Sequence, residues 1–256
     1  TTSQTAYYYN HHVRDIGNFT VVGPTGSGKT VFLSFIAAQT QRVQPRPKLL
    51  FVDKDRGAEI FIRGLGGQYK TLVPGEPTGF NPLSLPDAAA NREFLYQLFA
   101  FMLRPANGAE LSASEEQVIR NAIAAALTGG PAGRTLKAFS TLLRGRIRAG
   151  DGDLLARLES WMRPDQRGWL FNNEEDQFSL SSVVGFDMTR VLAAPVIRTA
   201  ALMYIFHRTE ELLTGDPVMI FLDEGWRLLD DDVFAFFIRD KLKTIRKQNG
   251  IVGFGT

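Results

Sequence analysis

The chain has 256 residues, of which 44% are hydrophobic and 22% are charged, and its formal net charge is +2. This composition is ordinary for a folded globular protein, and the small net charge gives no strong bias towards nucleic acid or a membrane surface. The chain has no cysteine, which excludes disulfides, thiolate metal sites and cysteine catalysis. No apolar run approaches the roughly 18 residues of a membrane span.

The first predicted element is a short buried strand at residues 19–22, followed by a glycine-rich loop and a helix over about residues 31–38. The loop matches the pattern G-x-x-x-x-G-K-[ST] at every specified position, and strand, loop and helix stand in the order that a phosphate-binding loop needs. The loop residues are Gly23, Pro24, Thr25, Gly26, Ser27, Gly28, Lys29 and Thr30. We therefore predict that this loop binds a nucleotide.

The residue types of the loop suit that chemistry. Its glycines allow backbone conformations that a Cβ would block, so the loop N–H groups can turn inward around a polyphosphate. The N-terminus of the following helix presents its dipole to the same anion. We expect Lys29 to reach the β- and γ-phosphates and the Thr30 hydroxyl to ligate Mg²⁺.

The next predicted strands are residues 49–52 and 69–73. Asp53 and Asp55 follow the first of them, near the phosphate loop. These carboxylates either orient Mg²⁺ or water, or they form a structural turn, and the sequence leaves both interpretations open.

From about residue 87 the pattern changes, because alanine, leucine, glutamate and arginine replace the β-branched runs. Apolar residues recur at helical spacing, for example Phe94, Leu98 and Met102. We predict an all-helical insertion of about four helices at residues 87–165, set into an α/β core made of residues 1–86 and 166–256. A basic patch in this insertion is either a solvated or protein-binding face or a nucleic-acid contact. Its members are Arg134, Lys137, Arg144, Arg146 and Arg148.

The α/β pattern resumes after the insertion. The predicted elements are a strand at residues 182–187, a helix at 195–213, a strand at 218–222, a helix at about 232–248 and an apolar strand-like run at 251–254. Strands that alternate with helices predict a parallel sheet with helices on both faces.

The strand at residues 218–222 ends in Asp223 and Glu224. Open α/β sheets bind their ligands at the carboxyl ends of the strands, so these two carboxylates are expected there. We predict that Asp223 holds Mg²⁺ together with Thr30 and that Glu224 polarises the attacking water as a general base.

The predicted helix at 232–248 has an apolar stripe and, beside it, a basic stripe of Arg239, Lys243 and Arg246. The basic stripe is either a solvated face or the source of an arginine finger that reaches a nucleotide phosphate, in this subunit or a neighbouring one. Arg239 and Arg246 are the candidates for that catalytic role.

Two features near the start of the chain allow weaker interpretations. Residues 7–9 are three tyrosines, which either stack on a nucleobase or cover the edge of the sheet. His11 and His12 are adjacent and therefore point apart, without other ligands at a metal-binding spacing, so metal binding by them is not favoured.

Several separate segments give the chain a resemblance to the C-terminal ATPase domain of the CagE/TrbE family, the VirB-type ATPases of conjugation and type IV secretion. These segments are residues 23–30, 53–59, 74–82, 223–226 and 238–250. The phosphate loop is generic, but the Phe80-Asn81-Pro82 turn and the Lys-Thr-x-Arg-Lys segment at residues 243–247 are more specific. The segments run from one end of the chain to the other, so the resemblance covers nearly all of it.

The resemblance implies a RecA-like core with a helical insertion and hydrolysis of ATP with Mg²⁺ on the cytoplasmic side of the bacterial inner membrane. It also implies a homo-oligomer, described as a hexamer in the family, that works with inner-membrane components and sister ATPases. The family's large N-terminal domain is missing from this chain, which starts without a methionine and stops within a strand-like run. We therefore expect a fragment of a longer protein.

Two other functions stay open. A RecA-like motor that pumps DNA would show ATP hydrolysis stimulated by DNA, with salt-sensitive affinity. A nucleotide-dependent scaffold would bind ATP and barely hydrolyse it, although such a scaffold has no need for Glu224 as a base.

Overall fold

The computed structural model describes residues 10, 17–143, 154–178, 181–225 and 232–256. Its strands are β1 (Phe19–Val21), β2 (Lys48–Asp53), β3 (Gln68–Thr71), β4 (Val183–Asp187), β5 (Val218–Leu222) and β6 (Gly250–Gly255). Its α-helices are α1 (Lys29–Thr40), α2 (Glu59–Gly64), α3 (Ala89–Met102), α4 (Ala113–Thr128), α5 (Leu136–Leu142), α6 (Leu154–Glu159), α7 (Gly168–Phe171), α8 (Pro195–Thr209) and α10 (Asp232–Lys247). Within these ranges, no helix is long and apolar enough to cross a membrane.

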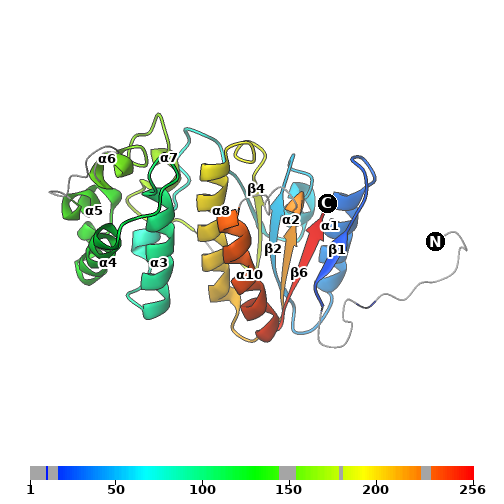
Figure 1. The fold of residues 1–256 in the computed structure, drawn as a ribbon. Helices are drawn as coiled ribbons and strands as arrows, with labels where there is room; N and C mark the ends of the chain where they lie inside the picture. Colours follow the sequence, from blue (N-terminus) through cyan, green and yellow to red (C-terminus); the bar gives the residue numbers. More distant parts are fainter. Residues whose placement is uncertain (1–9, 11–16, 144–153, 179–180, 226–231) are drawn as a thin grey trace, which may run out of the picture. The chain divides into compact units, whose positions relative to one another are not determined.

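In the part of the chain that the structure describes, six strands form one sheet in the order β1-β6-β5-β2-β4-β3 (Figure 1). Every pairing between neighbouring strands is parallel, which confirms the predicted α/β class with a parallel sheet. All residues of β4 and β5 are buried, as expected for inner strands that are covered on both faces. The carboxyl ends of all these strands therefore meet at one edge of the sheet.

The strand predictions hold to within two residues at each end. The helix predicted at residues 195–213 is α8 followed by a single 3-10 turn, η3 (Glu210–Leu212). Two further 3-10 turns are η1 (Pro82–Ser84) and η2 (Pro131–Gly133). The short helix α2 has no counterpart among the predicted elements.

The chain divides into two compact units. The first contains the described residues of Thr1–Thr71, Leu180–Thr189 and Arg208–Thr256, and it holds the whole sheet. The second contains those of Leu72–Ser179 and Arg190–His207 and is helical. The domain bounds expected from the sequence stay a prediction.

The core of the first unit lies between the sheet and the helices α1 and α2. Side chains of alternate strand positions, such as Leu49 and Phe51 of β2, pack there against Leu33 of α1 and Ile62 of α2. The alternation is a consequence of the two-residue period of a strand. On the other face, α10 packs against β6 with its buried residues (Figure 1).

An aromatic cluster around Tyr204 forms part of the core of the second unit. Tyr204 is fully buried, and four phenylalanine rings surround it with centroids 5.2 to 6.5 Å away. The rings belong to Phe80, Phe94, Phe171 and Phe178. Phe80 comes from the Phe-Asn-Pro turn, so this turn is anchored in the core.

The neighbouring Asn81 holds that turn to other loops of the same unit. Its side chain donates hydrogen bonds to the carbonyls of Arg134 and Glu174, at 2.9 and 3.1 Å, and its Oδ1 accepts one from the N–H of Leu83 at 3.1 Å. Asn81 is 1% exposed, so the side chain that makes these bonds is buried. The turn is thus a buried clasp that ties three segments together.

We predict that Asn81→Ala lowers the free energy of unfolding by about 2 kcal/mol, because it removes three hydrogen bonds that a buried side chain makes. Asn172→Ala is the matched control, since the Asn172 side chain makes one exposed hydrogen bond of 2.9 Å to the Met162 carbonyl. Urea unfolding of both variants measures the difference. Equal unfolding midpoints for the two variants would contradict the role of the clasp.

Candidate nucleotide-binding site

The glycine-rich loop connects β1 to α1 at the carboxyl edge of the sheet. Gly26 and Gly28 have φ values of 81° and 88°, in the left-handed region that favours glycine. The loop closes on itself through a hydrogen bond of 3.1 Å from the Ser27 N–H to the Pro24 carbonyl. Gly28 is the N-cap of α1 and supplies no side-chain cap, so the first N–H groups of the helix face the loop without a side-chain acceptor from that position.

The Lys29 side chain folds back over this loop. Its ammonium donates hydrogen bonds to the carbonyls of Gly23 and Pro24, at 2.7 and 3.1 Å. These bonds place a positive charge at the mouth of the loop, where the sequence predicts phosphates.

Thr30 and Asp223 are 193 positions apart in the chain, yet their side chains are in direct contact. The Thr30 hydroxyl donates to Oδ2 of Asp223 at 2.5 Å, and Asp223 is 6% exposed. The structure therefore brings together the two residues that the sequence predicts as Mg²⁺ ligands. A hydroxyl and one carboxylate suit Mg²⁺, which binds few protein ligands and completes its shell with phosphate and water.

The end of β6 lies between the loop and Asp223. The N–H of Gly23 donates to the Thr256 carbonyl at 3.1 Å, and the N–H of Thr256 donates to the Val21 carbonyl at 2.9 Å. A Cβ on Gly255 would stand 2.7 Å from Oδ1 of Asp223, so a larger residue there would displace the Asp223 carboxylate. The β6 end thus fixes the spacing between the two halves of the site.

Glu224 takes a left-handed backbone conformation with φ of 55°, which is uncommon for a residue other than glycine. Its N–H donates to Oδ1 of Asp223 at 3.1 Å. Its side chain is 20% exposed, and Oε1 lies 3.9 Å from Nζ of Lys54. The predicted base is therefore held at the same edge of the sheet, beside the predicted Mg²⁺ ligand.

Asp53 ends β2 beside Asp223 and is 1% exposed. Its carboxylate accepts hydrogen bonds from the N–H groups of Lys54 and Ala58, at 2.7 and 2.8 Å, and from the Tyr69 hydroxyl at 2.5 Å. Burial raises its pKa to about 6. These contacts occupy both oxygens of Asp53 and favour the structural turn over a role in orienting Mg²⁺ or water.

The basic stripe lies on the exposed side of α10. Arg239, Lys243 and Arg246 are all exposed, while Phe234 and Ile238 of the apolar stripe are buried. In the part of the chain that the structure describes, no hydrogen bond or ion pair joins these three residues to the glycine-rich loop. An arginine finger from this helix remains a prediction.

The predicted basic patch of the helical insertion is only partly described by the structure. The Arg134 guanidinium donates hydrogen bonds to the carbonyls of Leu85 and Leu127, at 3.4 and 2.9 Å. It therefore binds backbone groups of the second unit and does not form part of a solvated basic patch. Lys137, another member of the predicted patch, is exposed. The predictions for residues 7–9, His11, His12, Arg144, Arg146 and Arg148 lie outside the described residues.

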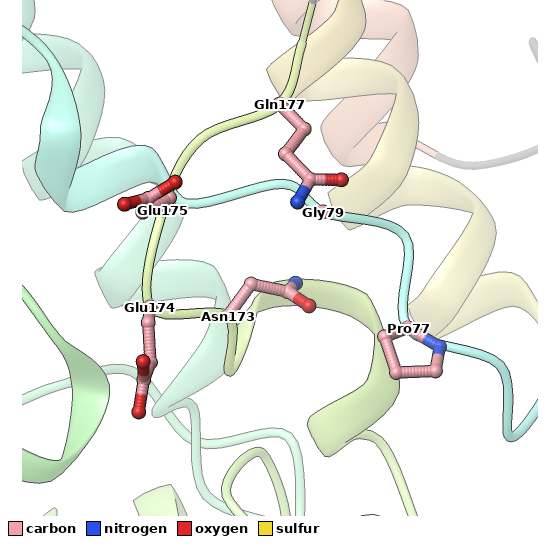
Figure 2. Close-up of a pocket in the computed structure, with 6 residues that line it drawn as sticks. All are labelled: Pro77, Gly79, Asn173, Glu174, Glu175 and Gln177. Carbon is pink, nitrogen blue, oxygen red and sulfur yellow. The ribbon is translucent and has the colours of Figure 1, made fainter.

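A hollow of about 240 Å³ lies in the second unit beside the Phe-Asn-Pro turn. Figure 2 shows the residues that line it, which come from two segments: Pro77 and Gly79 from one, and Asn173, Glu174, Glu175 and Gln177 from the other. The N–H of Gln177 donates to the Gly79 carbonyl at 2.7 Å, and the Asn173 side chain donates to the Phe80 carbonyl at 2.9 Å. These bonds join the Gln177 backbone and the Asn173 side chain to the segment of the Phe-Asn-Pro turn.

The fold and the site define a class: an α/β protein with a parallel sheet, whose glycine-rich loop and acidic strand end meet at one edge. No protein-family model matches the chain. The chain is 39% identical over 257 residues to the type IV secretion system protein VirB4 of Bartonella henselae and 37% identical over 280 residues to the type IV secretion system protein PtlC of Bordetella pertussis. The chain is thus a homologue of the VirB4 and PtlC proteins, which confirms the resemblance to the VirB-type family.

Both alignments cover the whole of this chain, which spans 32% and 34% of the length of these two relatives. The solved structure of VirB4 from Thermoanaerobacter pseudethanolicus resembles it with a TM-score of 0.74, over 98% of this chain and 71% of that one, at 19% sequence identity. This likeness supports the fold.

We predict that the Asp53 carboxyl titrates near pH 6 in the folded chain, against an ordinary value of 3.8. Between these two values the folded chain binds more protons than the unfolded chain, so the contribution of Asp53 to stability falls as the pH rises through this window. Carboxyl ¹³C NMR measures the midpoint. Tyr69→Phe should raise it further, because the Tyr69 hydroxyl donates to the charged form; a midpoint near 4 in the wild type would contradict the prediction.

Proposed function

We propose that this chain binds ATP with Mg²⁺ and hydrolyses it, as part of the motor of a type IV secretion or conjugation system. The observation that carries the proposal is the contact between Thr30 and Asp223, which joins the glycine-rich loop to the acidic end of β5. Homology to VirB4 and PtlC supports the secretion role.

In the proposed nucleotide complex, the backbone N–H groups of residues 23–30 and the N-terminus of α1 surround the β- and γ-phosphates. Lys29 exchanges its hydrogen bonds to the Gly23 and Pro24 carbonyls for charge-assisted bonds to phosphate oxygens. Because Lys29 already lies over the loop, this exchange needs only a side-chain rotation.

Thr30 and Asp223 are the residues that would hold Mg²⁺. When bound, Mg²⁺ neutralises charge on the phosphate oxygens of the nucleotide. Asp223 also anchors the Glu224 N–H, so the residue that holds the metal fixes the backbone of the proposed base.

Glu224 is the proposed general base. Its carboxylate accepts a proton from the water that attacks the γ-phosphate, and general bases of this kind contribute roughly 10²–10⁴-fold to the rate. The left-handed φ of Glu224 is the kind of uncommon backbone conformation that clusters at functional sites.

We further infer that the chain works as a homo-oligomer, a hexamer as in the resembled family, at the cytoplasmic side of the bacterial inner membrane. Its partners would be other type IV secretion subunits, including inner-membrane components and sister ATPases. Arg239 or Arg246 would then reach the nucleotide of a neighbouring subunit. The absence of an Asn-Lys-x-Asp segment from the sequence favours adenine over guanine.

We predict that the chain hydrolyses ATP with Mg²⁺, that Lys29→Ala removes hydrolysis together with nucleotide binding, and that Glu224→Gln keeps binding but lowers the rate about 10²–10⁴-fold. Steady-state phosphate release and binding of a fluorescent ATP analogue measure the two effects. DNA should leave the rate unchanged; strong stimulation by DNA would favour a DNA-pumping motor, and tight binding without turnover would favour a scaffold.

We predict that alanine substitution of Arg239 or Arg246 lowers hydrolysis by at least about 100-fold while assembly is retained, since arginine fingers contribute about 10³–10⁵-fold in related chemistry. Lys243→Ala, on the same stripe, is the comparison. Light scattering checks assembly, and the rate should depend on protein concentration. Wild-type rates of hydrolysis in all three variants, with normal assembly, would show that α10 supplies no arginine finger.

A further inference from the structure

The register of the sheet places Lys54 next to Glu224. Strands β2 and β5 pair in parallel with Val52 opposite Leu222, and the pairing continues with a hydrogen bond of 2.9 Å from the Asp223 N–H to the Val52 carbonyl. Two residues beyond that pair, Nζ of Lys54 lies 3.9 Å from Oε1 of Glu224. These two side chains emerge together at the carboxyl edge.

The backbones on both sides of this pair are fixed. Oδ1 of Asp53 accepts the Lys54 N–H at 2.7 Å, and Oδ1 of Asp223 accepts the Glu224 N–H at 3.1 Å. Both aspartates are buried. The remaining freedom of Lys54 and Glu224 is therefore mainly in their side chains, and the ion pair with Lys54 is one interaction that orients the Glu224 carboxylate.

The Lys54 ammonium has a second carboxylate partner besides Glu224. It also lies 3.7 Å from Oδ2 of Asp55, whose side chain is 68% exposed. The side chains of Lys54 and Glu224 are 29% and 20% exposed, and ion pairs that water reaches contribute only about 0–1 kcal/mol to stability. The pair therefore adds little to the stability of the fold, and its removal should leave the chain folded.

We propose that Lys54 is a positioning residue for the base Glu224, and that it holds the Glu224 carboxylate towards the water that the base activates. The inference rests on the proposed function of the site. Lys54 acts through Glu224 and, in this role, does not bind the nucleotide phosphates.

The chain offers a matched control on the same strand. Lys48 stands at the opposite end of β2, with its side chain 22% exposed and Nζ 3.5 Å from Oδ2 of Asp216. Its ammonium donates to the Leu212 carbonyl at 3.0 Å and to the Thr214 hydroxyl at 2.9 Å. Lys48→Met therefore removes a comparable ion pair away from the carboxyl edge of the sheet.

The test compares three variants: Lys54→Met, Lys54→Arg and Lys48→Met. Each is made alone and on the Glu224→Gln background. Two quantities are measured, the rate of single-turnover ATP hydrolysis and the Kd of a fluorescent ATP analogue. We expect Lys54→Met to slow hydrolysis about 10- to 100-fold, as misplacement of a catalytic group does, with a Kd within about twofold of the wild type. Lys54→Arg should recover most of the rate. On the Glu224→Gln background, Lys54→Met should cause no further loss, and Lys48→Met should match its parent throughout.

Three outcomes would overturn the proposal: equal rates for Lys54→Met and Lys48→Met, a full further loss on the Glu224→Gln background, or a weakened affinity for ATP with unchanged affinity for ADP. The last result would make Lys54 a γ-phosphate ligand. If Lys29→Ala abolishes hydrolysis but Lys54→Met leaves the rate unchanged, only the positioning role of Lys54 is refuted. A wild-type chain without Lys29-dependent hydrolysis refutes the proposed function and this inference with it.

Discussion

The candidate site depends on one constraint, the parallel alignment of β1, β6, β5 and β2. Because these strands point the same way, the loops that follow them share one edge of the sheet, although they come from distant parts of the chain. The contact between Thr30 and Asp223 follows from this alignment, as does the position of Glu224 beside Lys54. An antiparallel strand in this region would carry one of these residues to the opposite edge.

Much of the fold could be predicted from the sequence because its signals are local. The glycine-rich loop is continuous in the chain, and the five apolar residues before Asp223 indicate a strand buried on both faces without any knowledge of its neighbours. The helix α2 gave no such signal, since only Ile62 is buried while Ile60 is 84% exposed. Six residues with one buried side chain have too little amphipathic pattern to stand out.

The rest of the site depends on the order of strands in the sheet, which hydrophobic patterns do not contain. The pairing of β2 with β5 explains why Lys54 contacts Glu224 and why Asp53 lies beside Asp223. The hydroxyl of Tyr69 reaches Asp53 from β3, two strands away from β2 in the sheet order. Likewise, the sequence marks the Phe-Asn-Pro turn as distinctive, but only the folded chain shows that Asn81 is a buried clasp.

The position of β6 has a mechanical consequence. This strand starts within three residues of the last residue of α10, and its last residue, Gly255, lies beside Asp223. The next residue, Thr256, bonds to Val21 and Gly23 on the β1 side. Because β6 is hydrogen-bonded to β1 on one side and to β5 on the other, a displacement of α10 that moved β6 would act on both halves of the site. In the opposite direction, a change in the spacing between the glycine-rich loop and the carboxylates would displace β6 and with it α10. The strand would thus couple the nucleotide site to a helix on the surface of its unit.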